Sequence, residues 1–327
     1  MRYHYMDLIR FVSALIVCGG HLFFSANHSI GDSSPFNFFG LFQTGAFSVN
    51  LFFCLSGAAL HTQLAKVGFT RNWITARLVR LLPLYWICLS VPIISGLMLG
   101  TNFSYPRYAY ILDFFGLQSF SANIAITPGN PPLWSLSVEI ILSLSLLFVP
   151  LISRHRVILA ISIFAALVLF ASTNNPILNA VPFFYAGFMV SNVKSKIPSI
   201  SSHFTNALLP ILILFLPVAL IELESFRLMM FLELILCMLI ISLCLGSSLT
   251  LRTKIHSFTN RAYSLYCVHY PVITLIDKAF FPNDQRISLT QIVTSLCCVG
   301  FVTEVAYQFV DRKAMAISRN LLRHPNK

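Results

Sequence analysis

The chain has 327 residues, of which 57% are hydrophobic and only 10% are charged. A soluble domain is typically about one-quarter charged, so this composition excludes a surface that faces water on all sides and indicates an integral membrane protein. The net charge of +11 does not indicate nucleic-acid binding, because the basic residues are divided among loops rather than gathered in one stripe.

Apolar segments follow one another along the whole chain, and crossing a bilayer as a helix takes about 20 residues. We expect about ten transmembrane helices, at residues 7–25, 44–64, 79–99, 133–152, 156–172, 178–193, 207–222, 228–246, 262–280 and 290–310. The composition is uniform, which predicts a single all-α membrane domain over residues 1–327, with a short tail at 311–327. The eight cysteines lie in apolar runs without metal-ligand spacing, so neither a metal site nor a thiol nucleophile is expected.

The loop charges predict how the chain is oriented. With the N-terminus inside, the inner loops carry Lys66, Arg71, Arg77, Arg154, Arg156, Lys194, Lys196, Arg252, Lys254 and Arg261. The outer loops carry far fewer basic residues, and membrane proteins concentrate Lys and Arg on the cytoplasmic side. We therefore expect both termini in the cytoplasm.

The first helix carries a cation and an imidazole on one face. Ionisable residues inside membrane helices are costly and are functional candidates by default. Arg10 and His21 lie eleven residues apart, which is about three turns and about 16 Å along a helix. That arrangement suits a long ligand that enters from the cytoplasm. In the structural alternative, Arg10 reaches lipid phosphates and His21 only packs against its neighbours.

The second and third helices add polar candidates. Asn50 and Ser56 belong to a segment, Asn50–Gly57, whose small residues allow close helix approach, and both could line a cavity. Arg77 and Arg80 lie one turn apart where the third helix leaves the cytoplasm, and two guanidinium groups can grip phosphates there. Ordinary topology-determining charge is the alternative for these two arginines.

Two later helices carry the remaining candidates. Glu139 lies about 9 Å from the outer end of the fourth helix, at a depth similar to that of His21. A carboxylate hydrogen-bonded to the imidazole would orient the ring and raise its basicity, whereas a polar clamp between helices is the alternative. His269 lies mid-helix, shortly before Pro271, and could be functional or structural.

Five motifs in this order resemble the acyltransferase-3 family of membrane-bound O-acyltransferases. They are Arg10 with His21, Phe52–Gly57, Arg77–Pro83, Leu133–Glu139 and Tyr263–Pro271. Their order and their spread over most of the chain make the match specific. The segment Tyr307–Asp311 resembles the family's last-helix ending, although Asp311 and Lys313 replace the usual glutamate and proline.

The resemblance implies an enzyme of the bacterial inner membrane that uses cytoplasmic acyl-CoA, usually acetyl-CoA, as a co-substrate without a permanently bound cofactor. Members commonly acylate sugars of surface polysaccharides such as lipopolysaccharide O-antigen, and the acceptor here would be a polysaccharide or a lipid-linked glycan. We expect Arg77 and Arg80 to hold the CoA phosphates, with Arg10 further in.

In the expected reaction, His21, oriented by Glu139, acts as general base on the acceptor hydroxyl. Transient acylation of His21 remains open as an alternative. On the strength of the motifs alone, Tyr85, Trp134 and Ser135 are expected to bind the acceptor or the developing oxyanion. Further substrate-binding candidates are Asn50, Ser56 and His269.

A transporter or flippase is the competing class of protein. In that reading, Arg10, His21 and Glu139 form a proton- or anion-coupled path across the membrane. It accounts for the buried ionisable residues, but not for the order of the motifs or for the paired arginines of the third helix.

Overall fold

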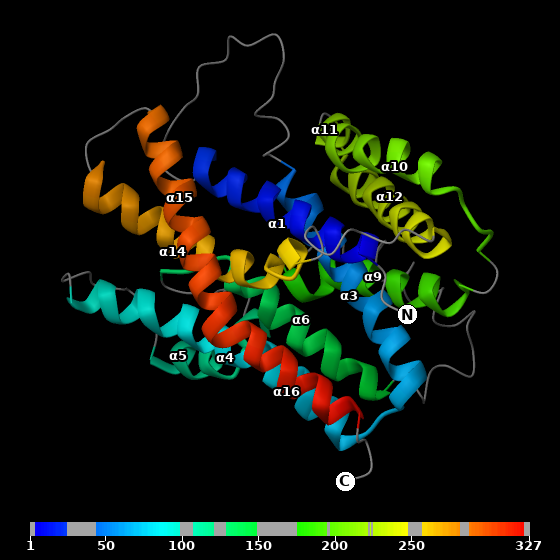
Figure 1. The fold of residues 1–327 in the computed structure, drawn as a ribbon, viewed down its shortest axis with the longest axis horizontal. Helices are drawn as coiled ribbons and strands as arrows, with labels where there is room; N and C mark the ends of the chain where they lie inside the picture. The colour runs from blue at the N-terminus through cyan, green and yellow to red at the C-terminus, as the bar shows by residue number, and fades with distance from the viewer. Residues whose placement is uncertain are drawn as a thin grey trace.

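The structure is a computed structural model that describes residues 4–24, 44–98, 107–120, 129–148, 175–194, 197–221, 223, 225–247, 257–281 and 288–323. Its α-helices are α1 (His4–Phe24), α3 (Gly45–Val67), α4 (Arg71–Met98), α5 (Arg107–Phe114), α6 (Leu133–Ser145), α9 (Pro176–Asn192), α10 (Ser202–Pro210), α11 (Leu216–Ile221), α12 (Phe226–Gly246), α14 (Ala262–Phe280), α15 (Leu289–Ala306) and α16 (Arg312–Arg323). Shorter 3-10 or π turns occupy Gln118–Phe120, Leu146–Phe148, Ile211–Phe215 and Tyr307–Asp311. The described residues form no sheet, only an isolated bridge between Ile200 and Ser247, so the all-α prediction is confirmed for them (Figure 1).

The expected apolar segments coincide with helices wherever the structure describes them, and the expected segment 156–172 lies outside the described residues. Among the residues that the structure describes, six helical runs are long and apolar enough to cross a membrane, so the expected number of about ten is not tested. They are His4–Phe23, Gly45–Val67, Arg71–Gly96, Ser202–Leu220, Phe226–Gly246 and Leu289–Arg323. The protein is therefore a multi-pass membrane protein. Of the expected segment 133–152 the structure describes α6, with 13 residues, and the 3-10 turn Leu146–Phe148 that follows it, whereas residues 149–152 lie outside the described part.

The last helical run is longer than the sequence predicts. We expected a helix at 290–310 followed by a tail, but α15, the π turn and α16 form one run of 35 residues from Leu289 to Arg323. The charges after Val310 do not end the helix, because Asp311 is fully buried and forms an ion pair with Arg80. At 1.5 Å per residue the run is about 50 Å long, and its final part, α16, packs along α4 (Figure 1).

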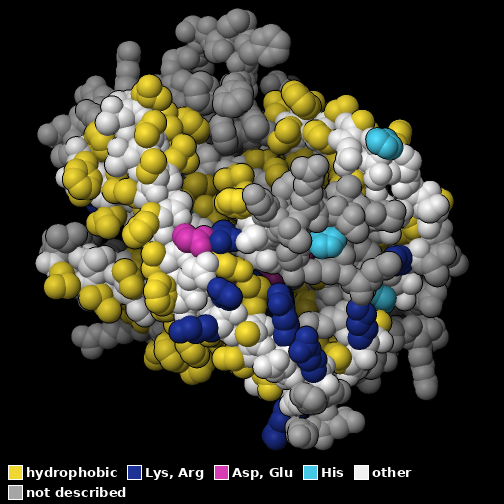
Figure 2. Space-filling model, in the orientation of Figure 1, with side chains coloured by type: hydrophobic (Ala, Val, Ile, Leu, Met, Phe, Trp, Pro, Cys, Tyr) yellow, Lys and Arg dark blue, Asp and Glu magenta, His cyan; other side chains and the backbone are white. Residues whose placement is uncertain are grey.

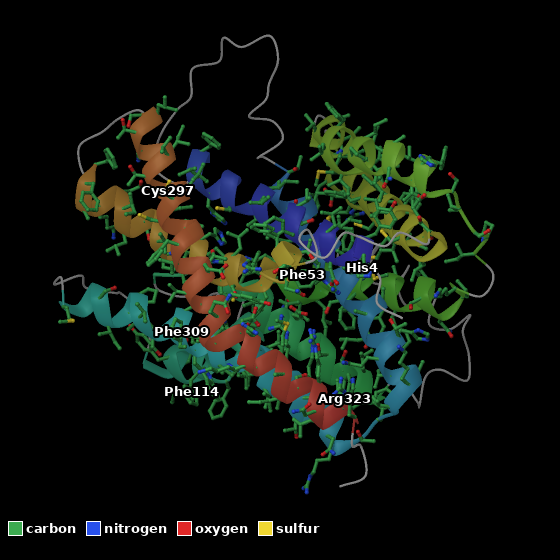
Figure 3. The ribbon with its side chains drawn as sticks, in the orientation of Figure 1. His4, Phe53, Phe114, Cys297, Phe309 and Arg323 are labelled. Atoms are coloured by element: carbon green, nitrogen blue, oxygen red, sulfur yellow. The ribbon has the colours of Figure 1, made fainter. Side chains whose placement is uncertain are left out.

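The outer surface of the helices is apolar. Met98 is 83% exposed and Phe301 is 71% exposed, and Figure 2 shows hydrophobic side chains over much of the visible face. Phe114 and Phe309, labelled in Figure 3, are also exposed large hydrophobic residues. Such a surface is stable against lipid and not against water, in agreement with the composition.

Two glycines hold α3 against α9 at the centre of the molecule. A Cβ added to Gly57 would lie 1.9 Å from the carbonyl oxygen of Phe184, and one added to Gly187 would lie 1.8 Å from that of Cys54. Any larger residue would push the two backbones apart. The expectation that small residues in the Asn50–Gly57 segment allow close helix approach is confirmed.

Candidate active site

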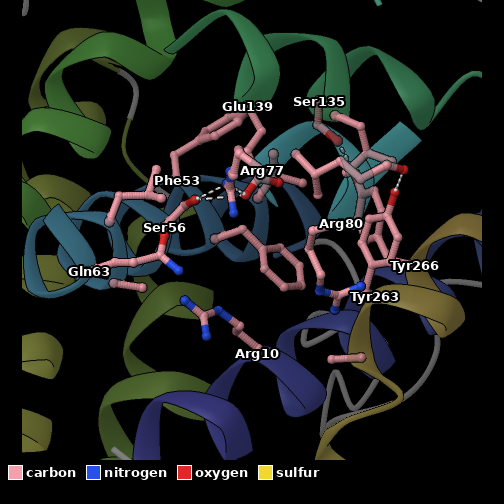
Figure 4. A pocket seen from close by; sticks show the side chains of 17 residues that line it. Arg10, Phe53, Ser56, Gln63, Arg77, Arg80, Ser135, Glu139, Tyr263 and Tyr266 are labelled. Atoms are coloured by element: carbon pink, nitrogen blue, oxygen red, sulfur yellow. Dashed lines mark hydrogen bonds and ion pairs between the residues drawn. The ribbon is translucent and has the colours of Figure 1, made fainter. Parts of the chain in front are cut away.

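A cavity of about 230 Å³ lies among α1, α3, α4, α6 and α14 (Figure 4). Its polar lining consists of Arg10, Ser56, Gln63, Arg77, Arg80, Ser135, Glu139, Tyr263 and Tyr266. Much of the remaining wall is apolar and includes Phe52 and Phe53. Six residues that the sequence marks as candidates thus meet in one space, although they come from four different helices.

The core of this cavity is a network around Arg77. Its guanidinium forms an ion pair with Glu139, donates from Nη2 to Ser56 Oγ at 3.0 Å, and donates from Nε to Ser143 Oγ at 3.1 Å. Ser56 Oγ in turn donates to Glu139 Oε1 at 2.7 Å. The side chains of Arg77 and Glu139 are only 17% and 21% exposed, so these bonds hold the guanidinium in a defined position.

The structure places Glu139 with Arg77 and not with His21, which corrects the predicted Glu139–His21 pair. The cause is the start of α4, which begins at Arg71 and not near residue 79 as expected. Arg77 therefore lies about 9 Å inside the helix, beside Glu139 and not at the start of α4. A guanidinium binds a partly buried carboxylate strongly, and Glu139 is held on the side of the cavity.

Arg80, one turn further along α4, has an acidic partner that the sequence analysis missed. It forms an ion pair with Asp311 of the π turn, and its guanidinium carbon lies 4.9 Å from the ring centre of Tyr263. Asp311 also accepts a hydrogen bond from Ser264 Oγ at 2.9 Å. The expected helix end at 310 had assigned Asp311 to the tail. The signal that could have found it was the need for a carboxylate to neutralise Arg80 at a similar depth.

Arg10 reaches the same cavity from the opposite side. In Figure 4 its side chain extends from α1 into the cavity on the side of Gln63. Its Nη2 donates to the carbonyl oxygen of Leu55 at 3.0 Å, and Nη1 lies 3.4 Å from Asp7 Oδ1. The three arginines predicted to bind one ligand therefore face one cavity.

His21 and His269 lie together outside this cavity, behind an aromatic layer. Tyr266, which lines the cavity, shares a hydrogen bond of 2.7 Å with Ser135 Oγ. Its ring centre lies 5.4 Å from that of Phe52 and 5.7 Å from that of His269. His269 is in turn 5.3 Å from His21, ring centre to ring centre. We call the side chains of Phe52, Tyr266 and His269 the aromatic wall.

His269 is a buried ring whose hydrogen-bonding state follows from its neighbours. The side chain is fully buried, and its Nδ1 lies 2.8 Å from the carbonyl oxygen of Tyr266 and 3.2 Å from that of Leu265. Both neighbours are acceptors, so Nδ1 carries the hydrogen and Nε2 of the neutral ring is left with a lone pair. Nε2 has no hydrogen-bond partner among the described residues. The half-buried His21, beside His269, also meets the ring of Tyr270 edge-on at 5.1 Å between ring centres.

Three other predicted substrate contacts do not line the cavity. Asn50 Nδ2 donates to Glu233 Oε2 of α12 at 2.8 Å. The buried Tyr85 hydroxyl donates to the carbonyl oxygen of Asp113 at 2.6 Å. Trp134 is half-buried on α6. The Asn50 and Tyr85 side chains thus connect helices.

The chain matches a known protein family. The sequence model of the acyltransferase 3 family, described as an acyltransferase domain, matches residues 3–307. No curated protein and no solved structure matches the chain. The matched range includes all five helices around the cavity and both histidines, whereas Asp311 and α16 lie beyond it.

Proposed function

Because the chain belongs to the acyltransferase 3 family, it is a membrane acyltransferase, and we propose that it moves an acetyl group from cytoplasmic acetyl-CoA to a sugar hydroxyl of a surface polysaccharide or lipid-linked glycan. The observation that supports this proposal is the convergence of Arg10, Arg77 and Arg80 on one cavity that adjoins the buried His269 and the half-buried His21. Family membership also favours an enzyme over the transporter alternative.

The arginine side of the cavity is suited to an anionic donor with a polar arm. Arg77 donates from its Nε and Nη2 groups to Glu139, Ser56 and Ser143. A guanidinium has five N–H groups, so Arg77 keeps the N–H groups of Nη1 for a ligand. In this proposal Glu139 is a positioning residue that fixes Arg77, and the donor binds Arg10, Arg77 and Arg80.

The histidine side provides the base. His21 removes the proton from the acceptor hydroxyl as its oxygen attacks the thioester carbonyl. The carbon–sulfur bond then breaks, the acetyl group stays on the sugar oxygen, and the CoA thiolate leaves and is reprotonated. His269 and Tyr270 position the His21 ring in place of Glu139. Attack by His21 itself, followed by transfer from an acyl-imidazole, is the covalent variant of this route.

The proposal includes the placement of the chain in the membrane. The beginning of α1, the end of α3 and the end of α16 all contribute to a second cavity, through residues that include Met6, Lys66 and Arg323. These helix ends therefore share one side of the described structure. That arrangement, with the loop charges, supports a single inner-membrane domain with both termini in the cytoplasm.

The proposal is tested with purified protein in nanodiscs, radiolabelled acetyl-CoA and a polysaccharide extract as acceptor. We expect acceptor-dependent release of CoA that falls at least about 100-fold in His21→Ala, because general-base catalysis contributes that much or more. His203→Ala, which removes an exposed histidine on α10, is the control and retains turnover. Full turnover by His21→Ala would refute the proposed role of His21, and failure of the intact protein to use any acyl-CoA would refute the donor.

A further inference from the structure

A second cavity, of about 510 Å³, lies on the side of the molecule where α1 begins and where α3 and α16 end. We call it the vestibule. Its charged and amide-bearing lining consists of Asp7, Arg10, Gln63, Lys66, Arg319 and Arg323. In Figure 2 Lys and Arg side chains gather along α16 and beside it.

The vestibule leads into the candidate active-site cavity. Arg10, Ala59 and Gln63 line both spaces. Lys66 at the vestibule and Ser56 in the inner cavity lie ten residues apart on α3, which is about 15 Å along the helix. A long ligand can therefore have one end in the vestibule and the other at the Arg77 network.

The charges of the vestibule are unbalanced. Among the described residues, four cations and a single carboxylate, that of Asp7, line it. Lys66, Arg319 and Arg323 are exposed, and within the described part of the chain none of the three forms an ion pair. In the inner cavity, by contrast, Arg77 and Arg80 each have a carboxylate partner. Cations brought together from three helices repel one another, which favours an anion between them.

We propose that the vestibule binds the phosphate groups at the nucleotide end of the acyl donor, while the donor's arm passes Arg10 into the inner cavity. This inference rests on the proposed function. The sequence predicted that Arg77 and Arg80 bind the phosphates. Here Lys66, Arg319 and Arg323 bind them instead. The inference also gives α16, which lies beyond the residues matched by the family, a part in substrate binding.

The test compares two charge-matched double variants of α16 in nanodiscs of zwitterionic lipid. Arg319→Gln with Arg323→Gln removes two vestibule cations, and Arg312→Gln with Lys313→Gln removes two exposed cations outside the vestibule. Calorimetric titration with CoA and with adenosine 3′,5′-bisphosphate measures phosphate binding. We expect affinity for both to fall about tenfold in the first variant, and to stay within about twofold of wild type in the second. Raising the ionic strength reduces the difference.

A donor without phosphates shows whether a variant has lost phosphate binding or has a general defect in activity. The vestibule variant raises the KM for acetyl-CoA about tenfold, but raises the KM for S-acetylpantetheine less than about twofold. Lys66→Gln, on a different helix, gives the same pattern and replaces the double variant if that protein does not fold.

The outcomes distinguish this inference from the proposed function. Equal CoA affinity in wild type, both double variants and Lys66→Gln overturns the vestibule and leaves the proposed acyl transfer standing. Wild-type protein that binds no CoA overturns the donor itself. Binding to vesicles of anionic lipid is measured in parallel, and its loss in the vestibule variant with unchanged CoA affinity assigns the vestibule to lipid headgroups and also overturns the inference.

Discussion

The ion pair between Arg77 and Glu139 can be measured by a double-mutant cycle with Arg77→Gln, Glu139→Gln and the double variant. At about 4 Å and an effective dielectric constant of about 20, two unit charges attract by about 4 kcal/mol. Both side chains are about one-fifth exposed to the cavity, and Arg77 keeps its bonds to Ser56 and Ser143, which reduces the loss. We therefore expect a coupling free energy of about 2–3 kcal/mol, and single variants destabilised by about 2–4 kcal/mol.

The assay is unfolding of the purified protein by denaturing detergent, monitored through tryptophan fluorescence. Glu304→Gln is the control, because its partner Arg261 is a comparable cation but the Glu304 side chain is 44% exposed. We expect Glu304→Gln to lower the free energy of unfolding by less than about 1 kcal/mol. A coupling below about 0.5 kcal/mol, or single variants no less stable than the control, would refute the reasoning that Glu139 holds Arg77.

Two further substitutions probe the surroundings of the cavity. Gly57→Ala places a Cβ 1.9 Å from the Phe184 oxygen, so we expect a loss of about 3 kcal/mol in the free energy of unfolding; Gly300→Ala, with open space around its Cβ, is the control and should match wild type in the same assay. Asp311→Asn leaves the Arg80 guanidinium without its carboxylate, and we expect it to lower the free energy of unfolding by about 3 kcal/mol. Wild-type thermal stability of this variant would contradict the pairing.

The helices and the meeting of the candidate residues were predictable, because apolar runs give helix positions and each interior charge needs a polar neighbour. Arg10, Ser56 and Arg77 come from three helices, yet their shared motif context predicted one site, and they line one cavity. Ser135 and Glu139 complete it in the same way.

The partners within the site were not predictable, because a sequence gives depth along a helix to within only a few residues and gives no rotation between helices. Because α4 begins earlier than expected, Arg77 pairs with Glu139, and His21 lies beside His269. The same uncertainty is the reason that the pairing of Asp311 with Arg80 was not predicted. Charged residues normally mark the end of an apolar span, and only the position of Arg80 in space shows that this one continues the helix.

The aromatic wall also affects the membrane in which the protein lies. Phe52 and Tyr266 line the arginine cavity, and His269 lies between Tyr266 and His21. An open aqueous path to His21 would bring water deep into the bilayer and offer protons a route through titratable side chains. The rings of Phe52, Tyr266 and His269 lie on that path in this structure, and in the proposed reaction they have to move before the donor's thioester can reach His21.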